Sequence, residues 1–271
     1  MLYEYSKFWN LNFNAIKCKV ISFTRSLTPI NFNYHMNGIP LENVSTFNDL
    51  GVSADQSLLF RNHIFDVIKK CNKVNGMIRH SIGYTAPASV TIKLYKALIQ
   101  PIVEYASPVW SPFTKIQIES VERIQRSFTR YALHYPAINY KERCECLNIL
   151  PLSFRREKMD LKLLFKSLFL ENFSNNVADL LTPHVAVKRL RSSENGLLFY
   201  PRLVRTETFK GFYSNRVVRL WNVLPIELRQ EQSLDSFVNL LNIFYHSKFN
   251  DTFNCDDVCS WTSTCRCQAC A

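Results

Sequence analysis

The feature that most constrains the fold of this chain is a helical spacing of apolar residues that begins after residue 60. In the segment 61–80, apolar side chains recur at three- and four-residue steps: Ile64, Val67, Ile68, Cys71, Val74 and Ile78. This spacing places them on one face of an amphipathic α-helix. Comparable patterns predict further helices at residues 88–105, 114–134, 153–170, 213–220 and 234–245.

Prolines and a hydroxyl side chain mark the expected ends of these helices. Pro101 is expected to break the helix at 88–105, and Ser107-Pro108 is expected to stop it. Ser153 is a suitable N-cap for the helix at 153–170, because its side-chain oxygen can accept a backbone N–H of the first turn.

The first 55 residues differ from the rest because they indicate strands. Residues 1–10 read as the end of a helix, and an extended segment follows at 17–23. Apolar and polar residues alternate from Ile30 to Met36, and Asn37-Gly38 is a two-residue hairpin signal. A third strand is expected at 45–53. The chain is therefore predicted to be α+β and mostly α, with a small N-terminal antiparallel sheet followed by helical regions.

The charge balance indicates a polyanionic partner. Among 271 residues, 33 Lys and Arg face 22 Asp and Glu, a formal net charge of +11. No apolar run approaches the roughly 18–20 residues that cross a membrane. The N-terminus lacks a basic region followed by an apolar core, so secretion is not expected and an intracellular location, cytoplasm or nucleus, is predicted.

Four regions are expected along the chain. An irregular, polar stretch at 171–206 provides the best internal boundary, because it contains two prolines and a Ser-Ser-Glu-Asn-Gly turn. The predicted regions are 1–55, 56–172, 173–250 and a cysteine-rich tail at 251–271.

Basic side chains line one side of three predicted helices. The helix at 61–80 carries Arg61, Lys69, Lys70, Lys73 and Arg79. The helix at 114–134 carries Arg123, Arg126 and Arg130 at i, i+3 and i+7, and the helix at 153–170 carries Arg155, Lys158, Lys162 and Lys166. Such stripes could contact phosphates, with affinity that falls steeply with salt. The alternative is an ordinary solvated face, partly neutralised by nearby glutamates at 119, 122, 142 and 157.

Cysteines suggest two environments. Cys18, Cys71, Cys144 and Cys146 are predicted to be reduced, small core residues. The other five crowd into the tail: Cys255, Cys259, Cys265, Cys267 and Cys270. Closely spaced thiolates can bind Zn²⁺, which would order a short segment that has no core of its own. A reduced, disordered tail is the alternative.

Several landmarks follow one another along the chain. They are Asn14–Lys19, Asp49–Val52, Leu94-Tyr95, Glu104-Tyr105, Val109-Trp110, Arg155-Arg156 and Trp221–Pro225. In this order and spacing they resemble the C-terminal part of reverse transcriptases from non-LTR (LINE-type) retrotransposons of the jockey and CR1 kind, over about residues 7–245. Trp110 and Trp221 lie near prolines after apolar runs and are expected to be core anchors rather than base-stacking residues.

The resemblance implies roles for individual segments. It implies that the segment Asn14–Lys19 closes a palm, with Lys17 near the incoming triphosphate, and that the hairpin with Gly51 grips the primer end. It also implies that the helix at 61–80 is the first thumb helix on an RNA–DNA hybrid. For Lys17 an ordinary surface lysine is the favoured alternative. The complete parent enzyme would use two Mg²⁺ ions held by palm aspartates. No aromatic-x-Asp-Asp box precedes Lys17, so no catalytic residue is predicted.

Three hypotheses remain open at this point. The first is a non-catalytic polymerase fragment that retains affinity for RNA or an RNA–DNA hybrid and that pairs with the missing polymerase portion. The second is a stand-alone nucleic-acid-binding or interaction module with a zinc-binding tail. The third is a decayed copy of a mobile element without a function.

Overall fold

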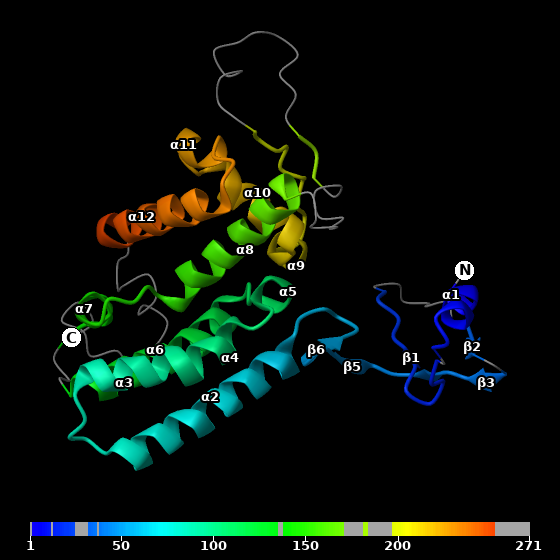
Figure 1. The fold of residues 1–271 in the computed structure, drawn as a ribbon, viewed down its shortest axis with the longest axis horizontal. Helices are drawn as coiled ribbons and strands as arrows, with labels where there is room; N and C mark the ends of the chain where they lie inside the picture. Colours follow the sequence, from blue (N-terminus) through cyan, green and yellow to red (C-terminus); the bar gives the residue numbers. More distant parts are fainter. Residues whose placement is uncertain are drawn as a thin grey trace, which may run out of the picture. The chain divides into compact units, whose positions relative to one another are not determined.

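The computed structural model describes residues 2–11, 13–24, 32–36, 38–134, 138–170, 181–183 and 197–252 (Figure 1). The chain divides into two compact units, residues 1–63 and 64–271. Helices dominate and short strands occur only before residue 56 among the described residues, which confirms the α+β, mostly α class. The finer region boundaries at 55, 172 and 250 stay predictions.

The described residues of the first unit form one short helix and three separate pairs of strands. Helix α1 is followed by pairs β1–β4 (parallel), β2–β3 (antiparallel) and β5–β6 (antiparallel). Their bounds are α1 Leu2–Phe8, β1 Lys19–Val20, β2 His35–Met36, β3 Ile39–Pro40, β4 Glu42–Asn43, β5 Thr46–Asp49 and β6 Val52–Asp55. The strands thus form two-stranded pairs, one of them parallel, rather than the single sheet expected from the sequence.

Two tight turns set the hairpins of this unit. Met36 pairs with Ile39 across positions 37 and 38, as the Asn-Gly signal predicted, and Gly38 has φ 77°. The expected third strand at 45–53 is instead a hairpin, because β5 turns back at Leu50-Gly51 and Asp49 pairs with Val52. Leu50 and Gly51 both have positive φ, 46° and 84°, as a type I′ hairpin turn requires.

The second unit is helical, and its main helices agree with the predicted ones. Helix α2 begins at the end of the first unit, and the rest follow in chain order. The bounds are α2 Arg61–Ile82, α3 Ala88–Leu94, π-helical segment η1 Tyr95–Ile99, α4 Gln100–Glu104, α5 Ser107–Trp110, α6 Lys115–Leu133, α7 Tyr140–Cys146, α8 Leu152–Phe169, α9 Glu207–Gly211, α10 Tyr213–Asn222, α11 Ile226–Arg229 and α12 Leu234–Thr252.

Two predicted helix boundaries are wrong for physical reasons. Pro101 does not break the second helix, because the π-helical segment η1 precedes it and the wider turn accommodates a residue that lacks an N–H. Ser153 does not cap α8, which starts one residue earlier after Pro151 without a side-chain cap of its own. The Glu122 carboxylate of α6 accepts the backbone N–H groups of Leu152 and Ser153 instead, at 2.9 and 3.1 Å.

Helix α8 lies at the centre of the helical unit. It packs against α5, α6, α10 and α12, and Figure 1 shows it running between α6 on one side and α10 and α12 on the other. Phe165 is fully buried and its ring stacks on Phe237 of α12, with the centroids 4.2 Å apart. Trp110 and Trp221 are also buried, which confirms both as core anchors.

A buried polar network joins α6 to its neighbours. Gln125 of α6 accepts the Tyr95 hydroxyl proton at 2.7 Å and donates to the Tyr140 oxygen and to the Leu150 carbonyl, each at 3.0 Å. The Tyr140 hydroxyl in turn donates to Glu122 at 2.5 Å. Buried polar groups of this kind specify a packing arrangement only when each has a partner, and here the chain connects η1, α6, α7 and α8.

The burial of the cysteines and the absence of a membrane-spanning helix among the described residues were also predicted from the sequence. Cys71 and Cys144 are buried as expected, whereas Cys18 is half-buried and Cys146 is exposed; all four are free thiols. Across the described ranges, no helix is both long and apolar enough to cross a membrane.

Candidate nucleic-acid interface

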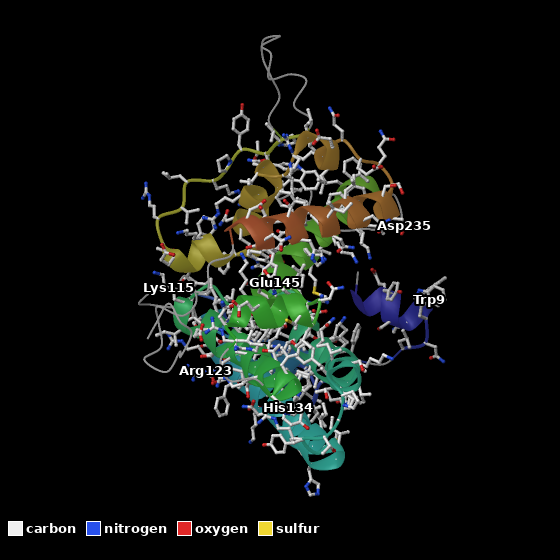
Figure 2. All side chains as sticks on the ribbon, turned by 90° about the vertical axis from the view of Figure 1, so that its left-hand side faces the viewer. Trp9, Lys115, Arg123, His134, Glu145 and Asp235 are labelled. Carbon is white, nitrogen blue, oxygen red and sulfur yellow. The ribbon has the colours of Figure 1, made fainter. Side chains whose placement is uncertain are left out.

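Only two of the three arginines of the predicted α6 stripe lie on its exposed face. Arg123 and Arg130 are exposed, two helical turns apart on one face, and Figure 2 labels Arg123 together with His134 near the end of α6. Arg126 is only 8% exposed. It pairs with Glu119 at 3.3 Å and lies over the Tyr140 ring, 4.9 Å from its centroid. The expectation that Arg126 shares the exposed face is therefore wrong, and this side chain is part of the protein interior.

The stripe of α8 is largely turned toward other helices. Arg155 forms an ion pair with Glu104 of α4, and Lys158 donates a hydrogen bond to Asn242 of α12. Burial, with help from the neighbouring positive charges, lowers the pKa of Lys158 to about 8. Lys162 is half-buried. Arg155 and Lys158 therefore do not form the exposed basic stripe expected from the sequence, because α8 lies between other helices.

The basic face of α2 is exposed within the described part of the chain. Lys69, Lys70 and Lys73 are exposed, and none forms an ion pair with a described residue. Asp66 is the single acidic residue of α2, which leaves this helix strongly basic. These lysines keep the placement that the sequence predicted, although their contact with nucleic acid stays a prediction.

The two site residues of the first unit are both exposed. Lys17 lies in a turn, and its backbone N–H donates to the Asn14 carbonyl at 3.1 Å. Gly51 occupies the β5–β6 turn. This geometry fits an ordinary surface lysine and a hairpin glycine, and the triphosphate and primer roles implied by the resemblance stay predictions.

A pocket of 500 Å³ opens where the C-terminal parts of α2 and α6 approach each other. Arg79 comes from α2, Tyr84 from the turn after it, and the remaining residues from α6 and its end. The lining residues are Arg79, Tyr84, Ser127, Arg130, Tyr131 and His134. None of these described lining residues is acidic. The pocket therefore combines two guanidinium groups with two phenol rings and an imidazole.

Local contacts fix the walls of this pocket. One terminal nitrogen of Arg79 donates to the carbonyl oxygen and to the hydroxyl of Ser127, both at 3.0 Å. The same guanidinium lies over the Tyr131 ring, 4.9 Å from its centroid, and the Tyr131 hydroxyl donates to the Gly83 carbonyl. Burial raises the pKa of Tyr131 above its usual value, so this hydroxyl stays protonated at neutral pH. Contacts within the protein thus hold the Arg79 guanidinium, which gives this wall of the pocket a positive charge.

Sequence reasoning found only part of this pocket. Arg79 and Arg130 belonged to the predicted basic faces, whereas Tyr84, Tyr131 and His134 were missed. Tyr131 follows Arg130 directly, and Tyr84 lies between the predicted helices at 61–80 and 88–105. The available signal was an aromatic residue near each arginine-bearing helix end. That pattern is weak until the structure shows that Arg79 of α2 meets Ser127 of α6.

No metal site is present in the described portion of the chain, where no group of three or more His, Cys, Asp or Glu side chains could hold an ion. The five tail cysteines proposed to bind zinc, Cys255 to Cys270, lie outside the described residues.

Comparison with known proteins supports a polymerase relationship. Over 131 residues the chain is 26% identical to the RNA-directed DNA polymerase from mobile element jockey of Drosophila funebris. The match covers 47% of this chain and only 14% of that protein. No family model matches the chain, and no solved structure matches it significantly. The chain is therefore related, over part of its length, to a retrotransposon reverse transcriptase; its placement in the thumb stays a prediction.

Proposed function

We propose that this chain is a non-catalytic part of a non-LTR retrotransposon reverse transcriptase that binds RNA or an RNA–DNA hybrid. The observation that carries the proposal is the exposed basic surface of α2 and α6. The pocket at the C-terminal ends of these helices has no acidic residue among its described lining residues. Lys69, Lys70 and Lys73 on α2 and Arg123 and Arg130 on α6 are the residues that meet phosphates. Such contacts hold a nucleic acid without reading its sequence.

The relationship to a jockey polymerase supports the choice of partner. A helix that carries several lysines and one acidic residue suits the minor groove of a hybrid, which is recognised through phosphates and sugars. In this proposal α2 acts as a thumb helix, whereas Arg155 and Lys158 stabilise the packing of α8 and are left out of the interface. Polymerisation itself requires metal-binding aspartates, for which this chain supplies no candidate box.

A direct test compares binding with catalysis. Fluorescence anisotropy with a labelled 20-nucleotide RNA and a matched RNA–DNA hybrid should show binding, whereas the same protein with Mg²⁺ should not extend a primer. The double variant Arg123→Gln/Arg130→Gln should weaken binding roughly tenfold, because two phosphate contacts are lost. Its matched control, Arg205→Gln/Lys210→Gln, removes two exposed charges elsewhere in the helical unit. Equal affinity in both variants would contradict the assignment, and primer extension would contradict the non-catalytic role.

A second role is favoured by the surface of the first unit. Most of its described large apolar side chains are exposed, including Phe8 at 81%, Trp9 at 57% and Ile16 at 76% (Trp9 is labelled in Figure 2). Ala15 and Val52 are the buried apolar residues among those described in this unit. Exposed apolar surface of this extent marks a contact with another polypeptide. We assign it to the remaining polymerase portion, and co-purification of the chain with a separately expressed jockey-type palm tests this.

A further inference from the structure

The pocket between α2 and α6 contains an aromatic ring that the fold does not bury. Tyr84 is 73% exposed, and its ring contacts two others: Tyr131 at 5.4 Å and His134 at 5.9 Å between centroids. Tyr131 and His134 also contact each other at 5.7 Å. The three rings form a small cluster in which Tyr131 is anchored in the protein and Tyr84 presents a free surface to solvent.

The charge of the pocket is placed beside these rings. Arg79 is held by Ser127 and by the Tyr131 ring, so its guanidinium is positioned before any ligand arrives. Arg130 is exposed at the same pocket and forms no hydrogen bond or ion pair with a described residue. A guanidinium prefers planar, multiply hydrogen-bonded recognition of phosphate. Arg79 and Arg130 lie next to the exposed ring of Tyr84. This arrangement suits a ligand that has an anionic group at one end and a planar ring at the other.

A volume of 500 Å³ is suitable for a small planar group together with a phosphate. In a duplex the bases are stacked inside the helix, so a protein meets mainly the backbone, and an exposed tyrosine adds little. In a single strand each base offers a face, and aromatic side chains bind it by stacking. The ring cluster therefore distinguishes this pocket from the plain basic face of α2.

We propose that the Arg79–Tyr84–Arg130 pocket binds one unpaired nucleotide of a single-stranded nucleic acid. The base stacks on Tyr84, while Arg79 and Arg130 hold an adjacent phosphate. His134, next to both tyrosines, closes the aromatic side of the site. This assignment rests on the proposed nucleic-acid binding and adds to it a preference for unpaired strands at one defined position.

The experiment measures anisotropy of the full chain with three probes of equal length: 10-nucleotide oligouridine, 10-nucleotide oligothymidine and a 10-base-pair RNA–DNA hybrid. Tyr84→Ala should weaken binding to both single strands at least about fivefold and change the affinity for the hybrid less than about twofold. Tyr84→Phe, which keeps the ring, should bind like the parent chain. Tyr105→Ala removes another exposed tyrosine, 56% exposed at the end of α4, and should leave all three affinities unchanged.

The outcomes separate this site from the general proposal. If Tyr84→Ala leaves single-strand affinity unchanged while the parent chain still binds, or if it weakens hybrid and single strands equally, the pocket assignment is overturned and the basic interface remains. If no probe binds the parent chain, both proposals fall together. A loss in one single strand only supports the site and shows that the sugar or the thymine methyl group, the two features in which these strands differ, contributes an additional contact. Thermal melting should show that Tyr84→Ala stays folded, because the Tyr84 side chain is exposed.

Discussion

Removing the Glu122 carboxylate is the change that most severely tests the account of the fold. Glu122 is 1% exposed and accepts three hydrogen bonds from three places: the Tyr140 hydroxyl at 2.5 Å and the backbone N–H groups of Leu152 and Ser153 at 2.9 and 3.1 Å. It joins α6 to α7 and replaces the missing cap of α8. Glu122→Ala leaves all three donors without this acceptor.

The magnitude follows from those donors and from one neighbouring charge. A buried donor that loses its partner costs about 1–3 kcal/mol. The Ser153 N–H belongs to a half-buried residue and can be rehydrated, so two donors carry most of the cost. Arg156 is also buried: burial lowers its pKa and the Glu122 charge opposes that shift, so removing the carboxylate leaves a buried cation less compensated. We expect Glu122→Ala to reduce the free energy of unfolding by about 3–5 kcal/mol.

Urea unfolding followed by circular dichroism measures this change. Glu122→Gln keeps one acceptor oxygen in the same shape and should lose about 1–2 kcal/mol. Glu145→Ala removes an exposed glutamate of α7, labelled in Figure 2, and should stay within about 0.5 kcal/mol of the parent chain. A loss below about 1 kcal/mol for Glu122→Ala, or equal losses for Glu122→Ala and Glu145→Ala, would refute the capping role.

Three further predictions concern ionisable side chains. The pKa of Lys158 is lowered to about 8, so between pH 8 and about 10.5 the unfolded chain holds this proton and the folded chain releases it. The parent should therefore gain stability relative to Lys158→Met as pH rises through that range, which urea unfolding at each pH measures. Burial raises the pKa of Cys71 and Cys144 to about 12, so iodoacetamide at pH 8 should label exposed Cys146 well before either, as read by peptide mass spectrometry. Asp160→Asn leaves the half-buried Arg216 of α10 without its carboxylate partner, but burial raises the pKa of Asp160 and Arg216 keeps its bonds to the Gly211 and Pro108 carbonyls, so the variant should destabilise the protein by about 1–3 kcal/mol. A melting temperature equal to that of the parent would contradict this ion pair.

Sequence patterning predicted the helices well because burial of one face sets their spacing. The helix at 61–80 matches α2, and the helix at 114–134 matches α6 within one residue at each end. Short helices such as α7 were missed, since seven residues give too little periodicity; its signal was the capping box formed by Asn139 and Glu142.

The candidate site was predicted less completely because it depends on packing between distant segments. The spacing of Arg126 places it in the α6 stripe, but its side chain is buried because it pairs with Glu119, two turns earlier, and packs over the ring of Tyr140 from α7. Arg155 and Lys158 look solvated until α8 is found at the centre of the helical unit. The pocket unites positions 79, 84 and 130, which no local pattern connects.

The salt dependence of RNA binding tests the central claim most directly. Affinity for a labelled single-stranded RNA should fall steeply between 50 and 200 mM KCl, because each phosphate contact releases counterions. The Arg123→Gln/Arg130→Gln variant should show a slope of log affinity against log salt that is less steep by about 1.4, since a single-strand phosphate contact contributes about 0.7. An affinity that does not change with salt, or identical slopes for the parent and the variant, would contradict a phosphate-binding surface on α6.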